Sequence, residues 1–341
     1  MNSSKRLLGI TLFFVMFFVV VSSTGYCRLD GIKASDCKIL KLTYAEVNPA
    51  SSYSGYIAKL FKQRVEELSL GTVLIDIKYG GILGNDNEVL TSMYQNDSPD
   101  ILRTSVSYLQ EYGANKAAML STPYVFENRD HYWKFISSGM YREFLDEITV
   151  NNSKFRGLCF IEEGYRHFFS RKPINSLFEL SGLKIRSAYG NYFEDLIKVF
   201  EASSVKVPFT EVNTALERGI IDGGEQPILN YLSNEFYRRA PYLILDAHVL
   251  ALSEIVISDN VWKQMSDEQK RVIVRAADYI QRVNKVTIRR AEEKALKTLK
   301  EKGVVVTEIN DMSPWKDKCS ELVFKITKVY SELYNKIQEI K

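Results

Sequence analysis

The chain has 341 residues, with 45 lysines and arginines against 42 aspartates and glutamates, so its formal net charge is only +3. A charge this close to neutral gives no electrostatic case for nucleic-acid binding. The apolar content of 45% and the aromatic content of 12% are ordinary for a globular protein with filled cores. The four cysteines have no Cys-x-x-Cys spacing and the three histidines have no metal-ligand spacing, so no metal site, redox centre or cofactor is predicted.

Residues 1–25 are predicted to be a signal peptide. Lys5 and Arg6 supply a positive start, residues 7–21 are uncharged, and small residues follow. This uncharged run is shorter than the roughly 20 residues of a membrane-spanning helix, so an uncleaved anchor is the weaker alternative. Lipid attachment at Cys27 is also disfavoured, because Tyr26 stands where lipoprotein signals carry a small residue. We expect an exported chain whose net charge is near +1 once Lys5 and Arg6 are removed.

Strand and helix patterns alternate after residue 37. Residues 38–44 alternate as a strand, and a helix capped by Ser51 or Ser52 ends at Gly71. A strand at 73–77, a helix at 85–93 and a strand at 100–104 complete this first series. The strand–helix–strand order predicts parallel pairing and a sheet covered by helices.

A second series begins at residue 155. It comprises strands at 155–162, 165–170, 183–187, 205–208, 242–246 and 251–258, helices at 192–200 and 210–218, and a tight glycine turn at 223–224. Residues 266–302 then form one charged amphipathic stretch without proline or glycine. A helix of that length measures about 55 Å, more than a single small domain. Because its heptad pattern is not clean, we expect it to lie across two lobes rather than to form a coiled coil.

Two arginines are candidates for binding an acid. Arg186 follows the apolar strand residues 183–185, and ligands of open α/β sheets bind at such carboxyl ends. Its guanidinium can hold a carboxylate through two parallel hydrogen bonds. Arg166 is framed by aromatic residues, which is typical of a cleft wall. The alternatives, a solvated arginine at position 186 and a surface cation–π pair at position 166, stay open on composition alone.

Three ordered blocks resemble the periplasmic solute-binding subunits of TRAP transporters, the DctP type. They are residues 182–186 (Gly-Leu-Lys-Ile-Arg), 208–216 (Pro-Phe-Thr-Glu-Val-Asn-Thr-Ala-Leu) and 219–227 (Gly-Ile-Ile-Asp-Gly-Gly-Glu-Gln-Pro). The similarity runs from about residue 41 to about residue 306. Several blocks in the right order are a strong signal, whereas any one alone is weak.

The resemblance assigns roles to four ligand-binding residues and none to catalysis. It implies that Arg186 holds the ligand carboxylate, that Arg166 assists, and that Phe209 stacks on the ligand. Gln226 occupies the position of the family's asparagine, which lengthens the amide arm by one methylene. The uncharged residues 104–107 disfavour sialic acid as the ligand. Nearby aromatic residues favour a more apolar organic acid; they are Tyr44, Tyr108, Tyr165 and Phe168.

The fold implied by the resemblance is an α/β, two-lobed periplasmic-binding-protein fold with hinge strands and a long helix spanning both lobes. Lobe I is expected to comprise residues 37–163 and 252–290, and lobe II residues 164–251 and 291–341. The expected function is periplasmic: capture of a small carboxylate ligand between closing lobes, and delivery to TRAP permease subunits driven by an ion gradient.

Two other functions stay open. An enzyme on the same scaffold would need a base near the cleft, and His167 and His248 are the histidine candidates. A receptor-type surface protein would use the lobes to bind another protein. The sequence contains no Gly-x-Ser-x-Gly elbow or recognisable Ser/His/Asp arrangement, so the binding function is the stronger prediction.

Overall fold

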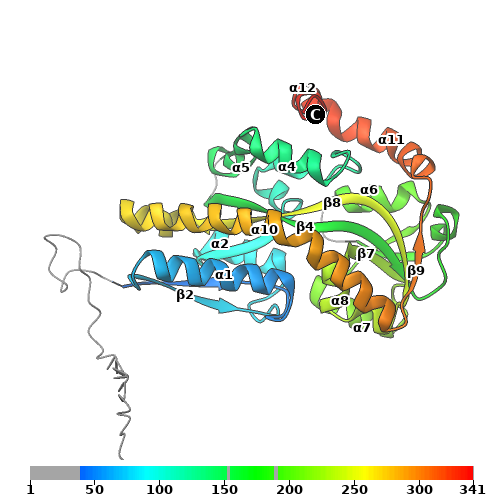
Figure 1. Ribbon diagram of the computed structural model, residues 1–341, viewed down its shortest axis with the longest axis horizontal. Coiled ribbons are helices and arrows are strands. Elements are labelled where there is room, and N and C mark those ends of the chain that lie inside the picture. Colours follow the sequence, from blue (N-terminus) through cyan, green and yellow to red (C-terminus); the bar gives the residue numbers. More distant parts are fainter. Residues whose placement is uncertain (1–38, 152–153, 188–190, 341) are drawn as a thin grey trace, which may run out of the picture. The chain divides into compact units, whose positions relative to one another are not determined.

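A computed structural model describes residues 39–151, 154–187 and 191–340, and a single mixed sheet of nine strands organises them (Figure 1). The predicted signal peptide, Cys27 and Cys37 lie outside the described residues. The sheet order is β2-β1-β3-β8-β4-β7-β5-β6, and β9 pairs with β8. The strands are β1 Leu40–Ala45, β2 Val73–Lys78, β3 Ile101–Ser105, β4 Phe155–Ser170, β5 Lys184–Ser187, β6 Ser203–Lys206, β7 Gly223–Pro227, β8 Tyr242–Ser258 and β9 Val305–Glu308.

The long antiparallel pair β4 and β8 connects the two halves of this sheet. One part of the pair, near residues 155–162 and 252–258, lies beside β3, and the other part lies beside β7 and β9. The sequence predicted two short strands in place of each long one. That prediction was wrong because the pairing continues through irregular positions, including a register shift between Glu162 and Gly164. The α/β, two-lobed fold with strands passing between the lobes is confirmed.

The first lobe is built on β1, β2 and β3. β1 pairs in parallel with both β2 and β3, as the strand–helix–strand pattern predicted. Alternate residues of the central strands supply cores on opposite faces: Phe160 and Val256 pack on one side, and Ile161 and Ile255 on the other. This period of two is the geometry of a strand buried on both faces.

The second lobe is built on β5, β6, β7 and β9. Gly223 and Gly224, predicted to form a tight turn, instead begin β7, which lies between β4 and β5. A Cβ atom on Gly223 would lie 2.1 Å from the carbonyl oxygen of Phe169. The glycines therefore serve close approach of the chains, and the prediction of a turn was wrong.

Helices cover both faces of the sheet. The α-helices are α1 Tyr53–Leu68, α2 Asp86–Asn96, α3 Asn115–Met119, α4 Arg129–Ser137, α5 Tyr141–Val150, α6 Asn191–Val199, α7 Val212–Glu217, α8 Ile228–Ser233, α9 Asp259–Gln264, α10 Asp267–Glu301, α11 Ser313–Thr327 and α12 Ser331–Gln338. Short 3-10 helices include η2 Tyr108–Tyr112 and η4 Phe209–Glu211. No helix in the described part of the chain is both long and apolar enough to cross a membrane.

The predicted long helix is present as α10, and it extends along both lobes (Figure 1). Ser266 caps it through a capping box with Gln269. Ile273 and Ile280 belong to the core shared with α1, whereas Ala295 and Leu299 belong to a core of the second lobe. The helix therefore contributes to the packing of both lobes.

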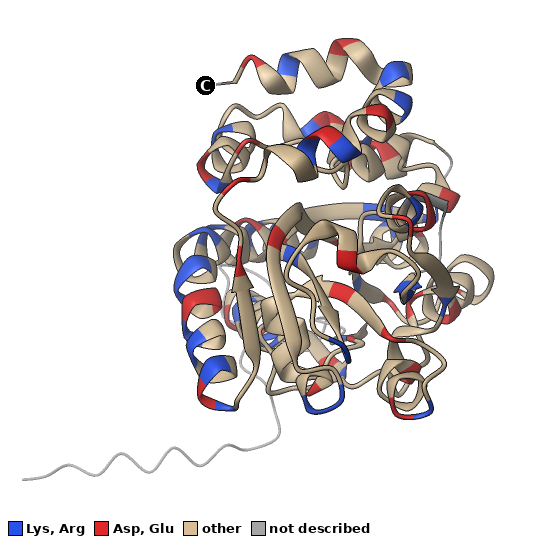
Figure 2. Cartoon of the chain, turned by 90° about the vertical axis from the view of Figure 1, so that its right-hand side faces the viewer, with Lys and Arg blue, Asp and Glu red and all other residues tan. Residues whose placement is uncertain are grey.

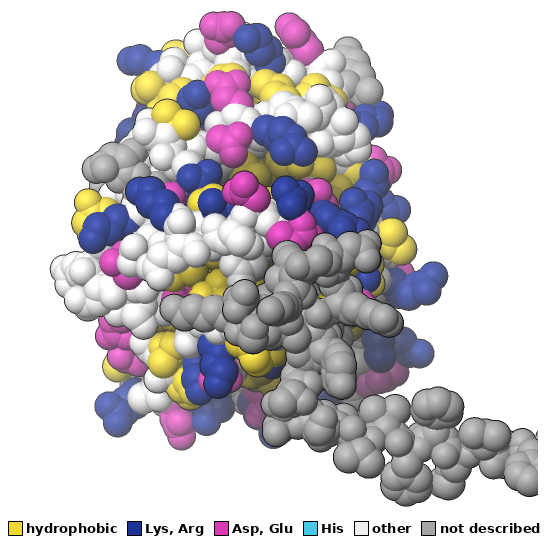
Figure 3. Space-filling model, turned by 90° about the vertical axis from the view of Figure 1, so that its left-hand side faces the viewer, with side chains coloured by type: hydrophobic (Ala, Val, Ile, Leu, Met, Phe, Trp, Pro, Cys, Tyr) yellow, Lys and Arg dark blue, Asp and Glu magenta, His cyan; other side chains and the backbone are white. Residues whose placement is uncertain are grey.

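The chain returns to the first lobe at its C-terminal end. α11 packs into the core beside α6 through Trp315 and Cys319. In α12, Ile337 is fully buried in the core formed by α4 and α5, and its carbonyl oxygen lies 2.8 Å from His131 Nε2. Positive and negative side chains are interspersed over the helices and over the surface in Figures 2 and 3, so neither view presents a face of one sign.

Candidate ligand-binding site

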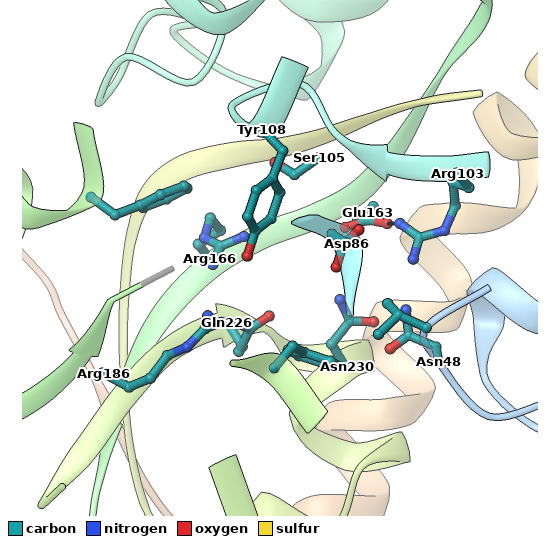
Figure 4. Close-up of a pocket in the computed structure, with 13 residues that line it drawn as sticks. Asn48, Asp86, Arg103, Ser105, Tyr108, Glu163, Arg166, Arg186, Gln226 and Asn230 are labelled. Atoms are coloured by element: carbon teal, nitrogen blue, oxygen red, sulfur yellow. Dashed lines mark hydrogen bonds and ion pairs between the residues drawn. The ribbon is translucent and has the colours of Figure 1, made fainter. Parts of the chain in front are cut away.

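A cavity between the two lobes gathers all four predicted ligand-binding residues (Figure 4). It encloses about 440 Å³ of space between atoms, including the open solvent at its mouth. The lining residues are Val47, Asn48, Asp86, Arg103, Ser105, Tyr108, Glu163, Arg166, Arg186, Phe193, Phe209, Gln226 and Asn230. The binding roles of Arg186, Arg166, Phe209 and Gln226 stay predictions, but their expected meeting at one place is observed.

Arg186 points into this cavity from β5. The strand places it where β5 runs toward the lobe boundary, and the side chain is only 2% exposed. Its Nε donates to the carbonyl oxygen of Val207 at 2.9 Å, and its guanidinium hydrogen-bonds to Tyr108. One terminal nitrogen, Nη2, is buried with no hydrogen-bond partner in the described structure. A buried donor of a charged group is costly to leave unpaired, so an anionic acceptor bound at this nitrogen would remove that cost.

Arg166 lies nearby on β4, but it already holds a carboxylate. Its Nε and Nη2 donate to the two carboxylate oxygens of Glu225 on β7, the latter at 2.7 Å. The same Nη2 also contacts the Glu225 carbonyl oxygen at 3.2 Å, and the guanidinium lies over the ring of Phe193 at 4.9 Å. This fixed geometry leaves Nη1 as the part of Arg166 that can meet a ligand.

A buried histidine supports the Arg166–Glu225 pair from behind. His248 Nε2 lies 3.4 Å from Glu225, and its Nδ1 lies 2.5 Å from Asp246. Burial lowers the pKa of His248, but the two carboxylates outweigh it and raise the pKa to about 9. Burial raises the pKa of Glu225, but Arg166 and His248 outweigh it and lower the pKa to about 2. Arg166, Glu225, His248 and Asp246 therefore form a buried row whose charges alternate at neutral pH between positive and negative.

The opposite end of the cavity is acidic, which the sequence reasoning did not find. Arg103 on β3 donates to both carboxylate oxygens of Glu46 at 2.6 and 2.7 Å, and it also pairs with Glu163 on β4. Asp86, the first residue of α2, accepts from the Thr104 hydroxyl at 2.7 Å. The carboxylates of Glu46 and Glu163 lie 57 and 60 residues from Arg103 in the chain, so they give no local sequence signal.

Gln226 and Phe209 complete the wall near Arg186. Gln226 is buried on β7, where its backbone is paired with His167 of β4. Phe209 begins η4, and the Arg186 guanidinium lies 5.9 Å from the centre of its ring. Of the four aromatic residues expected near the ligand, only Tyr108 belongs to the lining described above. Tyr44 and Phe168 lie in hydrophobic cores, and Tyr165 packs beside Arg129. The expectation of a more apolar organic acid stays a prediction.

Two contacts join the lobes beside residues that line the cavity. Asn234 after α8 donates through Nδ2 to Asn48 Oδ1 after β1 at 3.1 Å, and Asn48 lines the cavity. A Cβ atom on Gly81 would lie 2.8 Å from Thr210 Cγ2, next to the lining residue Phe209. These contacts bring chain segments of the first and second lobes together.

Comparison with known proteins identifies the family. The chain is 25% identical over 265 residues to the sialic acid-binding periplasmic protein SiaP of Vibrio cholerae serotype O1. This match covers 76% of this chain and 80% of that protein. It is 25% identical over 238 residues to the C4-dicarboxylate-binding periplasmic protein DctP of Shewanella loihica, covering 70% of each. The crystal structure of a TRAP periplasmic solute-binding protein from Polaromonas sp. JS666 bound to D-erythronate is 25% identical. Its TM-score is 0.83, and the match covers 89% of this chain and 99% of that one.

Most of the chain also matches the sequence pattern of one protein family. Residues 44–329 match the bacterial extracellular solute-binding proteins, family 7, abbreviated DctP. The predicted resemblance is therefore confirmed. The chain belongs to family 7 of the bacterial extracellular solute-binding proteins.

Proposed function

We propose that this protein captures a small organic acid in the interlobe cavity and delivers it to the membrane subunits of a TRAP transporter. The observation that carries the proposal is the buried, unpartnered Nη2 of Arg186, a residue that lines that cavity. A carboxylate is the acceptor that best matches a guanidinium, since it takes two parallel hydrogen bonds and neutralises the charge. The relatives named above are described as binding acids, which supports the same ligand class.

The proposal extends to location and to the division of the lobes. An exported, periplasmic protein with residues 1–25 removed agrees with the names of the two periplasmic relatives. Residues 37–163 with 252–290, and 164–251 with 291–341, are the proposed lobes. The boundary at 163–164 coincides with the irregular pairing of β4 and with Gly164, whose φ is +92°. α12 is an exception, because its contacts are with the first lobe.

Binding without chemistry fits the histidines better than catalysis does. His248 is fully buried, lies against Glu225 and Asp246, and is not part of the cavity lining. His167 accepts the backbone N–H of Ala247 through Nδ1 at 3.0 Å. Burial lowers the pKa of His167 to about 4, with Asp246 opposing. A general base must reach the proton it removes, and both rings are held by other protein groups.

Native mass spectrometry of the purified mature protein tests this function. We expect a small molecule with at least one carboxylate to co-purify, and to be released unchanged on denaturation. Vesicles containing the cognate permease should take up that molecule only when the binding protein and an ion gradient are present. A bound compound without an acidic group, or a compound converted to product during incubation, would contradict the proposal.

A further inference from the structure

The two ends of the cavity carry opposite, unbalanced charges. The lining and the groups paired directly with it hold three guanidinium groups, on Arg103, Arg166 and Arg186. They hold four carboxyl groups, on Glu46, Asp86, Glu163 and Glu225. The site therefore has no excess of positive charge before any acid enters. An anion without a compensating cation would leave the enclosed space with a surplus of negative charge.

The positive end is a single residue. The charge of Arg166 is matched by Glu225, and that of His248 is matched by Asp246. Arg186 forms no ion pair with any residue in the ranges 39–151, 154–187 and 191–340. Its uncompensated charge and its unpartnered Nη2 define one end of the ligand as an anion.

The negative end has more carboxyl groups than cations. Arg103 is shared by Glu46 and Glu163, and Asp86 is held by the neutral hydroxyl of Thr104. All four charged side chains here are less than a tenth exposed. Burial raises the pKa of Asp86, and Arg103 only partly opposes it. Burying surplus negative charge is costly unless a cation or a strong donor meets it.

We propose that the ligand is a small zwitterion, with its carboxylate on Arg186 and a cationic nitrogen facing Asp86 and Glu163. This inference rests on the proposed function and narrows its ligand class. Figure 4 shows Asp86 and Glu163 across the cavity from Arg186, with the amides of Asn48 and Asn230 beside them. The amide oxygens can accept further hydrogen bonds from an ammonium group. A dicarboxylate would place its second acid against two like charges, so the site selects against it.

Calorimetry with acids of matched length tests the inference. The probes are 3-aminopropanoate, 4-aminobutanoate and 5-aminopentanoate, each beside the hydroxy acid and the dicarboxylate of equal carbon number. We expect the tightest ligand of the full mature protein to be an amino acid, at least tenfold tighter than both partners of its length. A dicarboxylate or hydroxy acid that binds tightest would overturn the zwitterion and leave acid capture standing.

If no probe binds, the compound that co-purifies decides between the outcomes. A carboxylate with a cationic nitrogen supports the inference, and an acid without one overturns it. A protein that holds no acid in either measurement refutes the proposed function itself. The two failures are therefore distinguishable.

Substitution of the acidic end gives a second test. Asp86→Asn keeps a side-chain oxygen for Thr104, and we expect it to weaken the amino acid about tenfold while leaving the dicarboxylate unchanged or tighter. Glu163→Gln should change the two affinities in the same way. Because it also removes a carboxylate that pairs with Arg103, it can destabilise the fold as well. Asp76→Asn, an exposed carboxyl on β2, is the matched control. Equal weakening of both ligands by Asp86→Asn would assign Asp86 a purely structural role and overturn the inference.

Discussion

Arg166 and Arg186 lie in the same cavity and have opposite surroundings. Arg166 is held on two nitrogens by Glu225, which is itself supported by His248 and Asp246. Arg186 is held by a backbone carbonyl and a tyrosine, and one of its nitrogens has no partner. Both are less than a tenth exposed. The protein therefore neutralises one buried guanidinium internally and leaves the charge of the other unmatched.

This difference separates stability from binding. A buried charge with a complete set of partners contributes to the folded state, and removal of one partner costs about 3–5 kcal/mol. A buried charge without a partner costs stability until a ligand supplies one, so its free energy appears in the affinity. We therefore expect substitutions around Arg186 to change affinity and substitutions around Arg166 to change stability.

The largest expected effect is on affinity, from Arg186→Ala. Removal of the unmatched guanidinium should lower affinity for the native acid by about 100-fold or more, because the ligand carboxylate then lies in the cavity without its cation. The melting temperature should change little or rise, since an unpartnered buried donor is also removed. Calorimetry and thermal unfolding measure the two quantities.

Arg218→Ala, at an exposed position after α7, is the control and should retain full affinity. Arg186→Lys keeps the charge but loses the fork of donors, and should recover only part of the affinity. An Arg186→Ala variant that binds the native acid as tightly as the wild type would remove the role assigned to this residue.

The second effect is on stability, from Glu225→Gln. It leaves Arg166 and the protonated His248 without their shared carboxylate, which should lower the free energy of unfolding by about 3 kcal/mol. Chemical denaturation of the ligand-free protein measures this change. Glu217→Gln, which removes an exposed partner of Arg239, should cost less than about 1 kcal/mol. Similar losses in the two variants would mean that the buried row contributes no more than a surface ion pair.

The sequence predicted Arg186 and Arg166 together but not this difference between them. Both arginines follow from the resemblance, Arg186 also from its place at the end of a strand and Arg166 from the aromatic residues around it. The partners that distinguish them are distant in the chain: Glu225 lies 59 residues after Arg166, and Val207 lies 21 residues after Arg186. Local periodicity carries no information on such pairs, because they arise only when β4, β7 and β8 are packed.

The limited reach of local periodicity also explains the errors in the predicted strands, turn and helices. The alternation of apolar residues located β1, β2, β3 and β5 but missed β7 and β9, and it divided β4 and β8, since bulges interrupt the period of two. Gly223 and Gly224 were assigned to a turn because glycine is permissive, whereas here it admits the ring and backbone of Phe169. The segment after β3 and the last helices were not assigned, and their α-helices became visible only through the cores they complete.

The third effect depends on pH and concerns His248. Because the folded state raises its pKa from the ordinary 6.5 to about 9, the protonated ring stabilises the protein fully below pH 6.5. That stabilisation is lost as the pH rises through 9. Glu225, with its pKa lowered from 4.5 to about 2, has the opposite pH dependence: its stabilisation is present at neutral pH and is lost only as the pH falls toward 2. His248→Gln should therefore be less stable than the wild type by about 2 kcal/mol at pH 6, with the gap closing toward pH 9.

His131→Gln is the control for this prediction, because the His131 ring contacts the backbone of Glu127 and Ile337 rather than a carboxylate. Denaturant titrations at pH 5, 6, 7, 8 and 9 give the comparison. A constant gap between wild type and His248→Gln over this range would show that folding does not shift the pKa of His248.

The smallest effect is expected from Phe209→Leu, a substitution next to Arg186. The ring centre lies 5.9 Å from the guanidinium, near the limit of a cation–π contact, and Phe209 also packs edge-on against Phe236. Leucine keeps most of the apolar volume and removes the π face, so affinity should fall only about two- to fivefold, a change of about 0.5–1 kcal/mol. Phe178→Leu, at a residue 77% exposed, should leave affinity unchanged. Because the resemblance places the ring on the ligand, Phe209→Leu should weaken binding further in the Arg186→Ala background; no further loss in the double variant would instead show that the ring acts only through the guanidinium.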